Sequence, residues 1–286
     1  MNDLLIANGL HLLNLAIVLL ITALGLRTRP VDTLLMVRNP LLGARALIAL
    51  FLFVPACTLL MTWLLPLEPA IRASLLALSV APLCPILSKA ATKANSDGDY
   101  MVGLQVFAAI VSMAAVPAML ALTERIFDFD TRYPLGAIAF VILKQIGIPL
   151  AVGMGLAKLL DGKRELVALW LDRVGTVVLI TGMLMILAVV LPKVLFMTVN
   201  GRLLSVLVFT GFVLLAGRLF GGADKGTRDN LIMASTQRHP GISFVIATTV
   251  LPADEAPIIA VIVMFILVGT VATIPYMIKR KDPVAT

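Results

Sequence analysis

Two basic residues, Lys89 and Arg238, lie inside long apolar stretches of the sequence, and each is close to a proline. Lys89 follows Pro85 by four residues, and Arg238 precedes Pro240 by two. A charge in the middle of a bilayer costs about 2.5–3.5 kcal/mol and usually marks a functional site. Proline removes a backbone donor and clashes with the preceding turn, so a helix must bend or unwind there. A cation beside unwound backbone is suited to binding an anion at membrane depth.

Each basic residue belongs to a segment with other polar side chains. The first segment is SVAPLCPILSKAA (residues 79–91), and the second is STQRHPGIS (residues 235–243). The candidate substrate contacts are Lys89, Arg238, His239, Ser88, Thr236 and Gln237, and the candidate helix breaks are Pro82, Pro85, Pro240 and Gly241. The hydroxyl and amide groups of this set suit either substrate contact or hydrogen bonds between helices.

The two kinds of basic side chain predict different chemistry. Arginine offers a permanently charged, two-pronged donor for a carboxylate, whereas lysine can lose its proton when it is desolvated. Lys89 is therefore a candidate for coupling transport to protons, and so is Lys144, which lies in another apolar stretch. Lys144 faces either a cavity or a neighbouring helix.

The composition predicts an all-α polytopic membrane protein. Of the 286 residues, 60% are hydrophobic and 14% are charged, against about 25% charged in a soluble domain. Nine apolar stretches are long enough to span a bilayer. They are Leu4–Leu26, Leu42–Leu64, Ile71–Thr92, Tyr100–Leu122, Pro134–Leu159, Leu166–Leu191, Leu203–Phe220, Asn230–Val250 and Ala256–Ile278.

The loops between these stretches indicate the orientation. Twelve basic residues fall in or beside the loops of one side and five in those of the other. Because basic loops stay in the cytoplasm, the N-terminus is predicted outside and the C-terminus inside an inner or plasma membrane. The third and eighth spans, which contain the two proline breaks, then cross in opposite directions. Paired interruptions in two inverted halves point to the binding site of a secondary transporter. The alternative is that both prolines only kink their helices and that Lys89 extends to the membrane surface.

At the two segments the sequence resembles the bile acid:sodium symporter family. The resemblance rests on PLCPILSKAATKANSDGDYMVGLQV (residues 82–106) and TQRHPGISFVIA (residues 236–247). It implies inverted repeats with two crossing discontinuous helices, and alternating access by movement of a core against a panel. The implied panel is about residues 1–30 and 131–195, and the implied core is about residues 40–125 and 200–280. Family substrates range from bile acids to small carboxylates, so an organic anion is the expected substrate.

The chain departs from the family pattern where sodium would bind. The sodium-coupled members carry a carboxylate and a glutamine at the second break, where this chain has Ala234 and Arg238. They carry Ser-Asn at the first break, where this chain has Ser88 and Lys89. Sodium needs several oxygen ligands and is repelled by fixed positive charges. We expect the two basic residues to replace the ions, so that sodium is not bound. The alternative is a sodium-coupled symporter that uses other ligands.

Other classes of function lack support in the sequence. We find no motif for hydrolysis, nucleotide binding or metal binding, so no enzyme, catalytic residue, metal or cofactor is expected. The net charge of +7 lies in the loops and no nucleic-acid-binding motif accompanies it. A membrane sensor or an anion channel on the same scaffold is a further alternative. The expected partners are therefore the lipid bilayer, a small organic anion and protons as a coupling ion.

Overall fold

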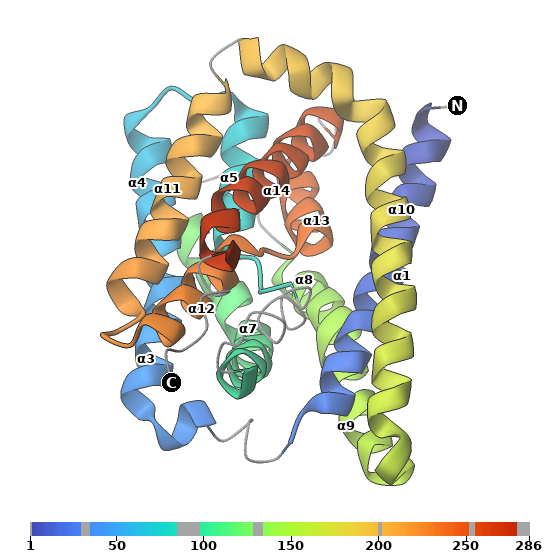
Figure 1. Cartoon of the computed structure of the whole chain (residues 1–286). Coiled ribbons are helices and arrows are strands. Elements are labelled where there is room, and N and C mark those ends of the chain that lie inside the picture. Colours follow the sequence, from blue (N-terminus) through green and yellow to red (C-terminus); the bar gives the residue numbers. More distant parts are fainter. Residues whose placement is uncertain are drawn as a thin grey trace.

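The computed structural model describes residues 2–29, 35–84, 98–127, 134–199, 202–251 and 255–278. Almost all of these residues are helical, and the helices gather into one bundle (Figure 1). The elements are α1 (Asn2–Arg27), α3 (Pro40–Leu47), η1 (Ile48–Phe53), α4 (Val54–Leu64), α5 (Pro69–Val80), α7 (Gly98–Phe127), α8 (Leu135–Ile142), η3 (Leu143–Gly147), α9 (Ile148–Leu160), η4 (Asp161–Lys163), α10 (Arg164–Val199), α11 (Arg202–Phe220), α12 (Lys225–Thr236), α13 (Pro240–Val250) and α14 (Glu255–Ile278).

Seven helical stretches in the described ranges are long and apolar enough to cross a membrane. They are Leu4–Arg27, Pro40–Leu64, Tyr100–Arg125, Leu135–Leu160, Arg164–Pro192, Leu203–Phe220 and Glu255–Tyr276. Each coincides with one of the predicted spans, and the chain is an integral membrane protein built from helices. The two remaining predicted spans correspond to shorter helices: α5 ends at Val80, and α12 and α13 are separate helices. Nine crossings therefore stay a prediction, because residues 85–97 lie outside the described part.

Close backbone contacts join α1 to its neighbours α9 and α10, which lie beside it in Figure 1. A Cβ atom at Gly25 would lie 2.5 Å from the carbonyl oxygen of Leu150, and one at Gly153 would lie 2.3 Å from that of Thr22. Gly9 and Gly182 make a similar approach between α1 and α10. Small residues allow this approach, which supplies dispersion contacts in lipid, where helix association has no hydrophobic driving force. The three helices therefore form one tightly packed unit.

An ion pair reinforces this unit near one end. The guanidinium of Arg27 on α1 donates a hydrogen bond to the carboxylate of Asp172 on α10, and it lies 3.7 Å from the carboxylate of Glu165. Asp172 is buried, so its charge requires such a partner.

Two of the spanning helices contain a π-helical turn that ends just before a proline. In η1, the N–H of Val54 donates to the carbonyl of Ala49, five residues back. The carbonyl of Leu50 thus loses its α-helical donor, and its π-helical donor would be Pro55, which has no N–H. The turn η3 repeats the arrangement, with Ile148 donating to Leu143 and Pro149 following. Each turn leaves a carbonyl available to another part of the molecule.

The glycine contacts lead to a stability prediction. Gly153→Ala places a methyl group against the backbone of α1, so the free energy of unfolding should fall by about 1–3 kcal/mol. Gly155, on the same helix, has no atom within 4 Å of its Cβ position. Gly155→Ala should therefore keep or raise stability, because alanine has the higher helix propensity. Thermal unfolding of both variants in detergent measures the difference, and equal melting temperatures would contradict the packing described.

Candidate functional site

The two interrupted segments lie side by side at the centre of the bundle. The chain after α5 runs antiparallel to the chain between α12 and α13, with Leu83 opposite Arg238. The N–H of Cys84 donates to the carbonyl of Gln237 at 2.8 Å, and the N–H of His239 donates to the carbonyl of Pro82 at 2.9 Å. Unwound backbone at membrane depth must find partners within the protein. Here each break supplies the partners of the other.

Arg238 joins this crossing to a third helical stretch. Its side chain is only 2% exposed. Nη1 donates to the carbonyl of Ala81 at 3.1 Å, and Nη2 donates to the carbonyl of Leu50 at 3.3 Å. The first acceptor lies at the C-terminal, partly negative end of α5, and the second is the carbonyl released by the π-helical turn η1. The positive charge is therefore held on backbone carbonyl groups from two helices.

His239 caps the second half-helix. It is the N-cap of α13, and its Nδ1 accepts a hydrogen bond from the N–H of Ile242 at 3.1 Å. Because Nδ1 is an acceptor, the neutral ring carries its proton on Nε2. Nε2 is buried and has no partner among the described residues. Such a donor costs about 1–3 kcal/mol unless a ligand satisfies it.

Two further polar residues, Asn14 and Gln145, come close to the start of α13, and the sequence analysis did not select them. Nε2 of Gln145 donates to Oδ1 of Asn14 at 3.2 Å. Oδ1 of Asn14 also lies 3.2 Å from the position that a Cβ atom of Gly241 would occupy. Oε1 of Gln145 is buried without a partner in the described part of the chain. The sequence could have indicated both residues, because each is a polar amide inside an apolar span. Lys144 was selected for the same reason, as a polar residue in an apolar span.

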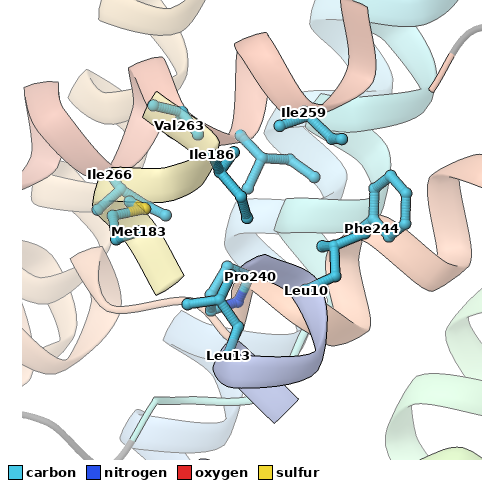
Figure 2. A pocket seen from close by; sticks show the side chains of 10 residues that line it. Leu10, Leu13, Met183, Ile186, Pro240, Phe244, Ile259, Val263 and Ile266 are labelled. Atoms are coloured by element: carbon cyan, nitrogen blue, oxygen red, sulfur yellow. The ribbon is translucent and has the colours of Figure 1, made fainter. Parts of the chain in front are cut away.

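Beside these polar groups lies an apolar cleft, shown in Figure 2. We use this name for the space lined by Leu10, Leu13, Met183, Ile186, Pro240, Phe244, Ile259, Ile262, Val263 and Ile266. The lining residues belong to α1 and α10 on one side and to α13 and α14 on the other (Figure 2). The cavity measures about 20 Å³, which is room for about one water molecule. The two sides are thus closed on each other in this conformation.

The other predicted contacts are placed differently. The hydroxyl of Thr236 donates to the carbonyl of Met233 within its own helix, at 2.8 Å. Gln237 is half-buried and contributes its carbonyl to the crossing, whereas Lys144 is exposed on η3. Pro82 and Gly241 lie at the crossing and at the first turn of α13. Pro85, Ser88 and Lys89 lie outside the described residues.

The family model for the sodium bile acid symporter family matches residues 14–205. The chain belongs to this family. The match includes α1 from Asn14 onward, the first break at Ala81–Cys84 and both π-helical turns, and it ends in α11 before the second break. Members of the family are transporters and not enzymes. No individual curated protein matches the chain.

The N-cap of α13 leads to a second prediction. His239→Ala removes the cap and should lower the free energy of unfolding by about 1 kcal/mol. His239→Ser supplies a hydroxyl that caps the same helix, so its stability should stay close to that of the wild type. Thermal unfolding of the two purified variants tests this difference. A His239→Ser variant as unstable as His239→Ala would show that the ring contributes by packing and not as a cap.

Proposed function

We propose that the protein carries a small organic anion across the membrane by alternating access without sodium coupling. The observation that carries this proposal is the guanidinium of Arg238 on the carbonyls of Ala81 and Leu50. In transporters with broken helices, unwound carbonyls and half-helix C-termini are the groups that coordinate a coupling cation. A covalently attached cation already satisfies them here. A sodium ion at the same place would meet a fixed positive charge with little solvent to screen it.

The anionic end of the substrate fits the start of α13. The N-terminus of a helix is partly positive and its first N–H groups have no helical acceptor. Gly241 lies in this first turn, and the Nε2–H of His239 is a buried donor without a partner among the described residues. A carboxylate would accept both hydrogen bonds. Asn14 and Gln145 would approach it from α1 and η3.

The apolar part of the substrate fits the apolar cleft. Pro240 lies at the first turn of α13 and lines this cleft, so the anion site and the cleft are continuous. The cavity of about 20 Å³ is far smaller than an organic substrate. Its two sides must therefore separate before the substrate can enter. We infer that this separation is the movement of the panel (about residues 1–30 and 131–195) against the core (about residues 40–125 and 200–280).

The packing of the helices supports the division into panel and core. α1 packs mainly on α9 and α10, whereas α11 packs on α12, and α13 packs on α5 (Figure 1). Close backbone contacts at Gly25 and Gly153 hold α1 against α9, whereas the apolar cleft lies between α1 and α10 on one side and α13 and α14 on the other. The cleft is thus a candidate for the interface that opens.

Orientation and coupling are the remaining parts of the proposal. The basic loops favour the N-terminus outside and the C-terminus in the cytoplasm of an inner or plasma membrane. In a mechanism without sodium, protons are the coupling ion for which the chain offers candidates, Lys89 and Lys144. Lys144 is exposed on η3.

The experiment is uptake of radiolabelled carboxylates, from small aliphatic acids to bile acids, into proteoliposomes. Uptake should be the same with an inward sodium gradient and with an inward potassium gradient, and a pH gradient should change it. An uptake rate that rises severalfold only with sodium would contradict the proposal.

The same assay tests the anion site. His239→Ser keeps a helix cap but lacks Nε2–H, and the loss of a hydrogen bond to a charged group should raise KM about tenfold or more. Arg173→Gln, which alters an exposed cation on α10, is the matched control and should leave uptake unchanged. A wild-type KM in His239→Ser would show that His239 does not bind the substrate.

A further inference from the structure

A second cavity, distinct from the apolar cleft, lies where α11 and α14 end and α12 begins. Its volume is about 300 Å³, and its wall includes Arg218, Lys225, Arg228, Asp229 and Tyr276. We propose that this cavity binds the phosphate group of a phospholipid headgroup. We call it the headgroup pocket.

The depth of the pocket in the membrane favours a lipid. Arg218 lies in the last turn of α11, two residues before the end of the candidate span Leu203–Phe220. Tyr276 ends the candidate span Glu255–Tyr276. The pocket is therefore at one end of two spans, the level at which headgroups lie and at which tyrosine is enriched. Ile232 and Pro275 add an apolar part to its wall, suited to the start of an acyl chain.

The excess of basic residues in the pocket favours an anion. Lys225 and Arg228 belong to the first turns of α12, whose partly positive end disfavours cations, and Arg218 adds a third. None of the three makes an ion pair with a described residue. The nearby Asp224 is the N-cap and accepts a hydrogen bond from the N–H of Thr227 at 2.7 Å, which lowers the pKa of its carboxyl. The carboxylate of Asp224 therefore caps α12. A bound phosphate would offset part of this positive charge and complement the helix end.

The acidic residue Asp229 favours a particular kind of headgroup. Asp229 is only 7% exposed and lines the pocket, so its carboxylate borders the space that a headgroup would fill. A buried carboxylate is stable only with a partner. The ammonium of phosphoethanolamine or the hydroxyls of phosphoglycerol would provide one on the far side of the phosphate. The pocket therefore favours these headgroups over phosphocholine, whose quaternary ammonium has no hydrogen to donate.

The test is native mass spectrometry of the purified full-length protein with added phosphatidylethanolamine, phosphatidylglycerol or phosphatidylcholine. The wild type should retain one molecule of the first two lipids and about tenfold less of the third. Arg218→Gln/Arg228→Gln should reduce retention about tenfold, since each cation near a lipid surface contributes measurably to binding. Lys158→Gln/Arg173→Gln, which removes two exposed cations elsewhere, should retain lipid like the wild type.

A second variant separates lipid binding from folding. Lys225→Glu places an acidic residue at the start of α12, which favours the helix while opposing a phosphate. Its melting temperature should be kept and its lipid retention lost. Wild-type retention in this variant, or stabilisation of the protein by inorganic phosphate as large as that by lipid, would overturn the proposal. The uptake assay with His239→Ser is independent of this pocket, so the two proposals can fail separately.

Discussion

A membrane offers no water to a backbone that leaves its helix, so every group released by a break needs a partner in the protein. The centre of this molecule is organised around that constraint. Two helices stop, at Val80 and at Thr236, and the extended residues that follow them pair with each other. The breaks are tolerated because their backbones form hydrogen bonds with each other. The half-helix that starts at Pro240 is then held at a fixed place with its positive end inside the bundle.

At the crossing, the carbonyls of Ala81 and Leu50 accept hydrogen bonds from Arg238. Its guanidinium links the C-terminal end of α5 to the carbonyl of Leu50, which is available because of the π-helical turn and Pro55. Carbonyl oxygens converging at mid-depth attract a cation, and either an ion or a side chain can provide it. A side chain binds at every ion concentration and cannot dissociate during the transport cycle. In the proposed function, a sodium gradient would therefore not drive transport through this place.

The sequence predicted the breaks for physical reasons that act locally, whereas the crossing of the two broken helices was an expectation from the family resemblance. Pro82 and Pro240 each remove a backbone donor and clash with the preceding turn, and Arg238 is too central in its span to reach water. Proline alone does not decide the break, since Pro117 and Pro275 lie inside continuous helices. Its acceptors were not predictable, because the free carbonyl of Leu50 depends on a π-helical turn that side-chain patterns do not encode. Asn14 and Gln145 were missed because an isolated amide in an apolar span is common. Only the structure shows that Asn14 lies close to the start of α13 and that Gln145 bonds to it. The hydroxyl of Thr236, selected as a substrate contact, bonds within its own helix, a frequent outcome for threonine in helices.

The central claim is that Arg238 occupies the place of a bound cation. Binding of ²²Na⁺ to the purified protein, measured by scintillation proximity from micromolar to millimolar sodium, tests it most directly. We expect no saturable binding by the wild type. Saturable binding that unlabelled sodium displaces and potassium does not would contradict it.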